Sequence, residues 1–215
     1  MPELVINGPE GRIEARYHRA ASSKAPIALV MHPHPMFGGT MNHKVVHNLF
    51  HAFVRSGFSV LRFNFRGVGR SQGTFNNGAG ELADAAAALD WLQSMHASAS
   101  HCWVTGYSFG AWISMQLLMR RPEIDSFISV APPANIYDFS FLAPCPSSGL
   151  LLQGTEDEVV LEPEVSKLAD KLIGQRGTGI RYQTIAGADH FFEGKLDELT
   201  DAVETYIETS MAPAA

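Results

Sequence analysis

Hydrophobic residues along the chain alternate between two spacings. Continuous apolar runs of about five residues are typical of strands buried on both faces, whereas spacings of three and four are typical of amphipathic helices. Strands are expected at 4–6, 13–17, 27–31, 59–65, 102–105, 127–130, 149–152 and 180–184. Helices are expected at 42–56, 81–95, 111–121, 162–173 and 196–209.

Strands that alternate with helices predict an α/β fold, with a mainly parallel twisted sheet covered by helices on both faces. The pattern predicts about seven or eight strands, and the turn at 7–11 indicates an antiparallel hairpin at the N-terminus. Without a linker or repeat, residues 1–215 are expected to form one domain, with a frayed tail from about 211 to 215. The segment 131–148 is too short for a cap domain, so an open site is expected.

Composition excludes several classes of partner. The net charge of −6 argues against nucleic acid or an anionic membrane, and no apolar run is long enough to span a bilayer. The first residues do not resemble a signal peptide, and the two cysteines do not form a disulfide framework. A reduced, cytoplasmic protein is therefore expected, and a homodimer is one expected oligomeric state.

The motif Gly106-Tyr107-Ser108-Phe109-Gly110 stands between a predicted buried strand and a predicted helix. A serine at such a tight strand-to-helix turn holds its hydroxyl at the end of the sheet. The N–H of Phe109 would point into the same space from the start of a helix, where it could stabilise an oxyanion. Ser108 is thus the candidate nucleophile.

A serine nucleophile needs a base, and reacting groups in parallel sheets gather at the carboxyl ends of strands. His190 follows the last predicted strand and Asp157 follows the preceding one, which gives the chain order Ser, Asp, His. His190 is expected to act as general base and Asp157 to orient it. Asp138 is the rival acid. Three other loop acids are expected to be solvated: Glu156, Glu158 and Asp189.

With these motifs, the chain resembles the α/β-hydrolase superfamily over nearly its whole length. Within it, the chain is similar to small lidless esterases and dienelactone-hydrolase-like proteins. Its His-Pro-His-Pro loop at 32–35 is similar to that of a group of small bacterial members. The resemblance implies that this loop supplies a second oxyanion donor. Proline has no N–H, which leaves His34, the position that matches the family donor, or Met36.

Other motifs are given structural interpretations. Gly67-Val68-Gly69 lacks the rest of a dinucleotide-binding fingerprint. His43, His47 and His51 share one helix face, but the helix has no zinc-protease glutamate, so a solvated face is favoured over a metal site. No metal or cofactor is expected. The expected substrate pocket includes Phe37, Tyr107 and Phe191.

The resulting hypothesis is a cofactor-free serine hydrolase, a carboxylesterase that cleaves small to medium acyl esters through an acyl-enzyme on Ser108. An acyl thioesterase or a peptidase of the same fold remains an alternative. In a different class, the chain could be a hydrolase-like binding protein without catalysis.

Overall fold

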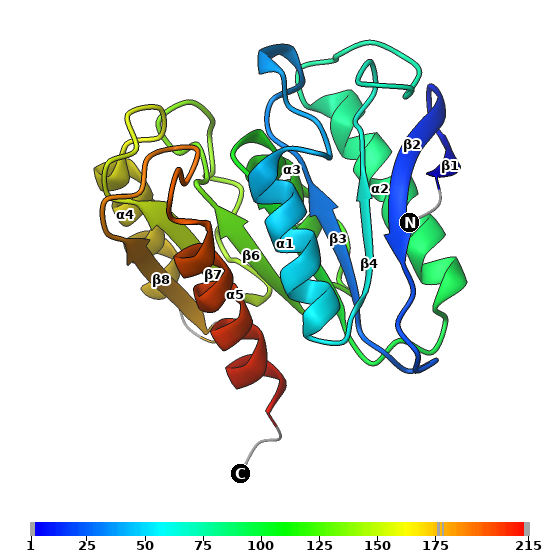
Figure 1. Ribbon diagram of the computed structural model, residues 1–215. Helices are drawn as coiled ribbons and strands as arrows, with labels where there is room; N and C mark the ends of the chain where they lie inside the picture. The colour runs from blue at the N-terminus through cyan, green and yellow to red at the C-terminus, as the bar shows by residue number, and fades with distance from the viewer. Residues whose placement is uncertain (1–2, 176, 178, 213–215) are drawn as a thin grey trace.

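The computed structural model describes residues 3–175, 177 and 179–212, and it contains one eight-stranded sheet with strand order β1-β2-β4-β3-β5-β6-β7-β8 (Figure 1). The strands are β1 (Glu3–Gly8), β2 (Gly11–His18), β3 (Ile27–Met31), β4 (Ser59–Phe63), β5 (Cys102–Tyr107), β6 (Ser126–Val130), β7 (Ser148–Gly154) and β8 (Ile180–Ile185). The helices are α1 (Lys44–Arg55), α2 (Ala79–Met95), α3 (Phe109–Leu118), α4 (Glu162–Ile173) and α5 (Leu196–Met211), with a short 3-10 helix, η1 (Pro35–Phe37).

Strand direction follows the prediction of a mainly parallel sheet with an N-terminal hairpin. β1 pairs antiparallel with β2, and β2 pairs antiparallel with β4. From β4 through β3 to β8, every neighbouring pair is parallel. The carboxyl ends of these six strands therefore meet at one edge of the sheet, and the loops that follow them can share one site.

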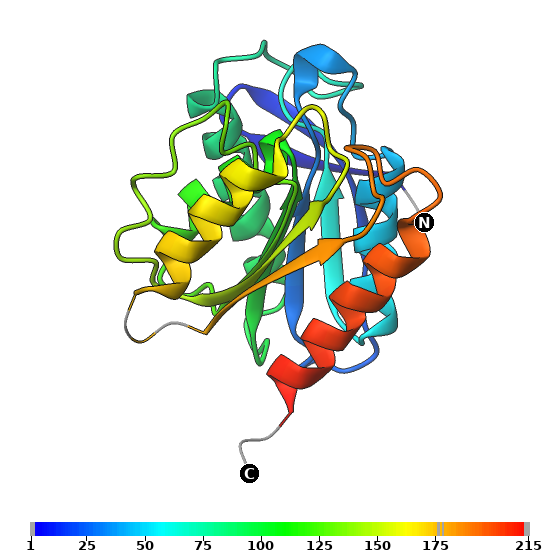
Figure 2. The same ribbon diagram turned by 90° about the vertical axis from the view of Figure 1, so that its left-hand side faces the viewer.

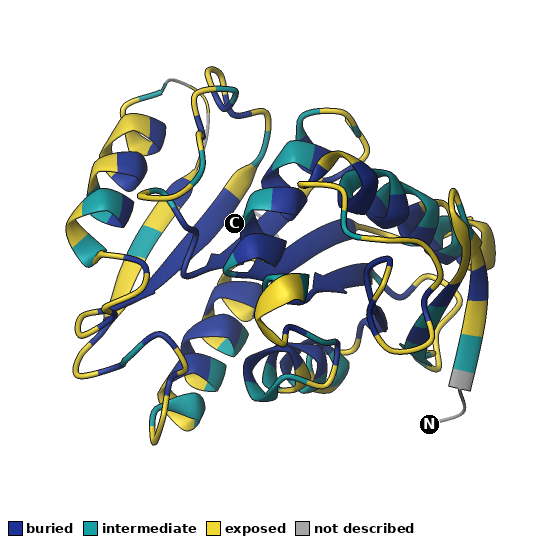
Figure 3. Ribbon diagram, turned by 90° about the horizontal axis from the view of Figure 1, so that it is seen from above, coloured by how far each residue is buried: buried dark blue, intermediate teal, exposed yellow. Residues whose placement is uncertain are grey.

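Helices cover both faces of the sheet. Figures 1 and 2 show α1 and α5 on one face and α2, α3 and α4 on the other, and each face has its own hydrophobic cluster. All residues of β3, β4, β5 and β6 are buried, which explains their continuous apolar runs. The view along the strands in Figure 3 places these buried residues between the two helical layers.

One helix differs from its predicted range in a way that concerns the site, whereas the predicted lack of a cap is confirmed. Helix α3 begins at Phe109, directly after the candidate nucleophile, and ends at Leu118 instead of continuing to Arg121. No helix is present at 131–147, between β6 and β7, so this described loop contains no helical cap. The predicted frayed tail lies partly outside the described residues, because α5 continues to Met211 and residues 213–215 are not described.

Candidate active site

Ser108 lies at the junction of β5 and α3 in a strained conformation. Its backbone has φ 55° and ψ −120°, a region that residues with a side chain rarely adopt. The turn requires both flanking glycines, because a Cβ on Gly106 would lie 2.1 Å from the Gly110 carbonyl oxygen and one on Gly110 would lie 2.5 Å from the Met31 carbonyl oxygen. The strain and the close packing together hold Ser108 at the carboxyl edge of the sheet.

Asp157 follows β7 and is held through both carboxylate oxygens. Its Oδ1 accepts hydrogen bonds from the N–H groups of Val159 at 2.9 Å and Val160 at 2.7 Å. Its Oδ2 accepts from Gln153 Nε2 at 3.1 Å and from His190 Nδ1 at 2.8 Å. Such a set of donors stabilises a buried, ionised carboxylate in a single orientation.

His190 follows β8, and its backbone is tied to the strand that carries Ser108. The Tyr107 hydroxyl donates to the His190 carbonyl oxygen at 2.7 Å, and the two rings pack with centroids 5.2 Å apart. Because Nδ1 donates to Asp157, the neutral imidazole has an unprotonated Nε2, which is the nitrogen a general base uses. His190 and Ser108 line the same cavity.

The loop after β3 places His34 beside the start of α3. The rings of His34 and Phe109 pack with centroids 5.0 Å apart. Met36 donates its N–H to His34 Nδ1 at 3.1 Å, so this donor already has a partner. In the described part of the chain, the backbone N–H groups of His34 and Phe109 have no hydrogen-bond acceptor. Of the two residues that the sequence left open, His34 therefore has the free donor.

His32 connects this loop to the segment after β4. It is fully buried, its Nδ1 donates to the Pro33 carbonyl oxygen at 2.6 Å, and its Nε2 accepts from the Phe65 N–H at 3.0 Å. The next residue, Arg66, makes two hydrogen bonds through its guanidinium to Asp84 of α2, at 3.0 and 2.7 Å. The loop that carries His34 is thus fixed by groups outside the cavity.

Burial lowers the pKa of His32 to about 3, from 6.5 in the unfolded chain. At pH values between about 3 and 6.5, His32 binds a proton in the unfolded chain but not in the folded chain. His32 therefore makes the folded protein less stable as the pH falls below 6.5. We expect the free energy of unfolding of the wild type, relative to that of His32→Asn, to fall by about 2 kcal/mol from pH 7 to pH 5. Urea denaturation of both proteins at the two pH values measures this change. A difference that is the same at pH 7 and pH 5 would contradict the lowered pKa of His32.

The cavity beside Ser108 has a volume of about 380 Å³ and a largely apolar wall. The expected pocket residues Phe37, Tyr107 and Phe191 all line it. Further lining residues are Pro33, His34, Gly39, His43, Phe109, Pro133, Ile136, Tyr137, Val159 and His190. Among the described residues, the wall therefore has no Lys, Arg, Asp or Glu side chain.

The rival acid Asp138 and the three other loop acids do not line the cavity beside Ser108. Asp138 accepts hydrogen bonds from Ser140 and lines a different cavity, next to Glu164 and Lys167 of α4. Asp189 accepts from the Glu193 N–H, and Glu156 and Glu158 are exposed. Among the described residues there is no group of three metal-ligating side chains, so the histidine stripe on α1 does not form such a cluster.

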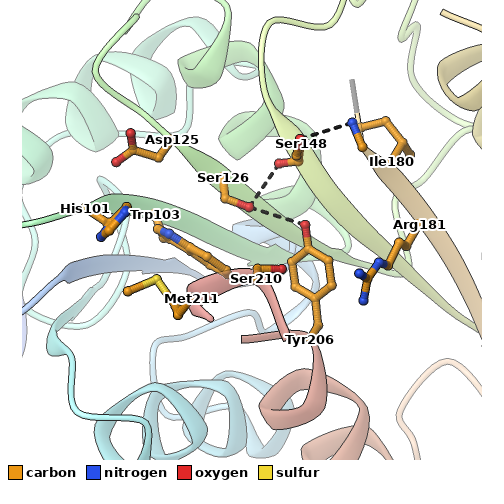
Figure 4. Close-up of a pocket in the computed structure, with 11 residues that line it drawn as sticks. His101, Trp103, Asp125, Ser126, Ser148, Ile180, Arg181, Tyr206, Ser210 and Met211 are labelled. Carbon is orange, nitrogen blue, oxygen red and sulfur yellow. Dashed lines mark hydrogen bonds between the residues drawn. The ribbon is translucent and has the colours of Figure 1, made fainter. Parts of the chain in front are cut away.

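A larger cavity of about 540 Å³ lies at the opposite end of the sheet, beside the first residues of β6, β7 and β8 (Figure 4). There the Ser126 hydroxyl lies between the Ser148 carbonyl oxygen at 3.0 Å and the Tyr206 hydroxyl at 3.4 Å. This serine is not on a strained turn, and its hydroxyl already has hydrogen-bond partners in Ser148 and Tyr206. Cavity size alone therefore does not identify the candidate site.

Three contributors to the site were missed by sequence reasoning. Gln153 is fully buried and donates to Asp157, His32 positions the loop after β3, and His43 lines the cavity from the start of α1. The buried Gln153 had a detectable signal, because a polar residue at the end of an apolar strand needs partners. The position of His43 depends on how α1 packs and has no such signal.

Comparison with known proteins places this chain in a family. Residues 11–206 match the family model described as X-Pro dipeptidyl-peptidase (S15 family). A solved α/β hydrolase of unknown function from Agrobacterium tumefaciens is 58% identical, with a TM-score of 0.95 over 98% of this chain and 96% of that one. A serine hydrolase without a lid from Xanthomonas campestris is 32% identical, with a TM-score of 0.88 over 100% of this chain and 96% of that one.

A more distant relative is the lysophosphatidylserine lipase ABHD12 of Bos taurus, which is 26% identical over 73% of this chain. The chain spans only 44% of the length of that protein. Within the described residues, no helix is both long and apolar enough to cross a membrane. The match of the family model over most of the chain, together with the two solved relatives, establishes that this protein belongs to the S15 family, among the serine hydrolases of the α/β-hydrolase fold.

Proposed function

We propose that this protein is a carboxylesterase that forms an acyl-enzyme on Ser108. The observation that carries this proposal is the hydrogen bond of 2.8 Å from His190 Nδ1 to the buried Asp157, in a histidine that lines the same cavity as Ser108. A serine hydroxyl is weakly nucleophilic and needs a base of this kind. The strained turn supports the same role, because it holds the hydroxyl in one place before substrate binds.

The reaction follows from the roles of the three side chains. His190 Nε2 takes the proton from Ser108 as its oxygen attacks the ester carbonyl, and Asp157 stabilises the resulting imidazolium. His190 then gives that proton to the departing alcohol oxygen as the carbon–oxygen bond breaks. His190 Nε2 next takes a proton from a water molecule as the water oxygen attacks the acyl carbonyl, and it returns that proton to the Ser108 oxygen as the bond to the acyl carbon breaks and the acid leaves.

The oxyanion that develops on the carbonyl would be held by two N–H groups, from Phe109 and His34. The choice of His34 over Met36 is supported by the hydrogen bond from the Met36 N–H to His34 Nδ1. Donors that are placed before the reaction need no reorganisation when charge develops. The attachment of this loop through His32 supports such preorganisation.

The wall of the cavity favours an uncharged, apolar acyl group. Phe37, Ile136 and Phe191 are exposed by 86%, 57% and 50%, and all three line it. A dipeptidyl-peptidase substrate carries a free ammonium group, which needs a carboxylate partner when buried. Since no acidic side chain lines the described cavity, esters are favoured over such peptides. The name of the bovine relative, a lipase, agrees with ester hydrolysis.

The family description makes a peptidase the second candidate, and an acyl thioesterase is the third. We expect the highest kcat/KM on p-nitrophenyl butyrate, a lower value on butyryl thioesters, and little cleavage of glycyl-prolyl p-nitroanilide. A fluorophosphonate probe should label Ser108, as peptide mass spectrometry would show. Faster cleavage of the proline amide would assign a peptidase, and absence of labelling would favour a binding protein without catalysis.

A further inference from the structure

His43 precedes α1 and caps it. Its Nδ1 accepts a hydrogen bond from the Val45 N–H at 3.3 Å. A ring nitrogen that accepts a hydrogen bond holds no proton, so in the neutral imidazole the proton is on Nε2. Helix capping thus sets the tautomer of this side chain.

The imidazole of His43 stays neutral over the ordinary pH range. Burial, together with the nearby Lys44 and His190, lowers its pKa to about 4. A neutral ring in this tautomer is a hydrogen-bond donor at Nε2 and is neither a base nor a cation. In the described part of the chain, Nε2 has no hydrogen-bond partner.

His43 lies on the His190 side of the cavity. Its ring packs on Tyr107 at 5.1 Å and lies 6.4 Å from Phe191, measured between ring centroids. Tyr107 and Phe191 are also aromatic neighbours of His190, at centroid distances of 5.2 and 5.5 Å. The proposed oxyanion donors belong instead to His34 and Phe109, whose rings contact each other.

The side of the cavity determines which part of the substrate His43 meets. His190 must give its proton to the departing alcohol oxygen, so that oxygen lies next to His190. A donor beside His190 therefore faces the alcohol portion of the ester. An N–H in a largely apolar wall favours a ligand that brings an acceptor to it, because an unpaired donor there is unfavourable.

We propose that His43 is a specificity-determining residue that donates a hydrogen bond from Nε2 to an oxygen on the alcohol portion of the substrate. The favoured substrates are esters of oxygenated alcohols, such as glycol or glycerol esters, in preference to esters of plain alkyl alcohols. This inference rests on the proposed esterase function and names the substrate class of the same site.

A matched pair of esters tests the proposal. 2-Methoxyethyl butyrate and butyl butyrate have the same chain length and differ by one ether oxygen in place of a methylene group. The ratio compared is kcat/KM for 2-methoxyethyl butyrate divided by kcat/KM for butyl butyrate. One hydrogen bond is expected to make this ratio about three- to tenfold larger in the wild type than in a variant without the donor. Comparing ratios between enzymes cancels the difference in intrinsic reactivity of the two esters.

Two variants separate the donor from the helix cap. His43→Ser retains an N-cap acceptor but removes the Nε2 donor, so the ratio should fall about three- to tenfold. His43→Gln loses the cap but retains an N–H donor near the position of Nε2, so the ratio should stay close to that of the wild type. His47→Ser, on the same helix but not among the cavity-lining residues, is the matched control.

The outcomes distinguish this inference from the proposed function. Hydrolysis of both esters with the same ratio in the wild type and His43→Ser would overturn the role of His43 and leave the esterase intact. Loss of the preference in both variants would also overturn it, because it would assign the preference to the ring and not to the donor. Failure to hydrolyse either ester, with no fluorophosphonate labelling of Ser108, would overturn the proposed function itself.

Discussion

Replacing Ser108 by alanine is expected to lower kcat for p-nitrophenyl butyrate by about 10⁶-fold. The substitution removes the only atom that would form the acyl-enzyme, and what remains is catalysis by the oxyanion donors and by binding. Alanine also adds no strain to the turn, because the serine that it replaces already carries a Cβ at φ 55°. The fold should therefore survive, and the loss should appear in kcat.

The measurement is steady-state hydrolysis together with fluorophosphonate labelling, and Ser114→Ala is the matched control. Ser114 lies in α3, the helix that follows Ser108, is buried, and donates to the Ala111 carbonyl oxygen at 2.8 Å. The control should stay within a few-fold of the wild type. Turnover by a folded Ser108→Ala protein at more than a hundredth of the wild-type rate would rule out the assigned nucleophile.

Replacing Asp157 by asparagine is expected to lower kcat by about 10⁴-fold while leaving the shape of the site unchanged. The N–H groups of Val159 and Val160 both donate to Oδ1, so the amide oxygen of the variant will occupy that position. Its NH₂ group must then face His190 Nδ1 and Gln153 Nε2, where the carboxylate oxygen Oδ2 was. The amide would donate to Nδ1 and place the imidazole proton on Nε2, which could no longer take the proton of Ser108.

The same substitution puts the new NH₂ group against the Gln153 NH₂ group, so some loss of stability is expected as well. Thermal unfolding separates this loss from the effect on kcat. Asp138→Asn is the control, because Asp138 is the rival acid and lines another cavity. A larger loss of activity in Asp138→Asn than in Asp157→Asn would transfer the role to Asp138.

Both predictions depend on reacting groups that the structure holds firmly in place. Ser108 is held by a strained turn between glycines, Asp157 by four hydrogen bonds, and the loop with His34 through buried His32. The exposed side chains of Phe37, Ile136 and Phe191 surround these fixed groups. Such a site combines fixed reacting groups with exposed apolar side chains against which the apolar parts of a substrate can pack.

Local patterns in the sequence were sufficient to predict the layered fold. Continuous apolar runs indicated buried parallel strands, because a strand covered on both faces has no polar side. The Gly-x-Ser-x-Gly motif could be placed at a strand-to-helix junction for a local reason, since only glycine fits where the backbones of neighbouring segments touch. The positions of Asp157 and His190 after successive strands followed from the rule that parallel strands end at one edge.

The three-dimensional arrangement of loops and helices decided the rest. The attachment of His32 to Phe65 joins residues from two different segments, and the position of His43 depends on how α1 packs. The hydrogen bonds from Gln153 to Asp157 and from the Val45 N–H to His43 are local, but they form only once the chain around them has folded. The choice between His34 and Met36 also required the folded loop, because it turned on which N–H was already bonded. Residue order specifies which strands and turns form, but the direction of a polar hydrogen and the pairing of donors with acceptors depend on three-dimensional distances.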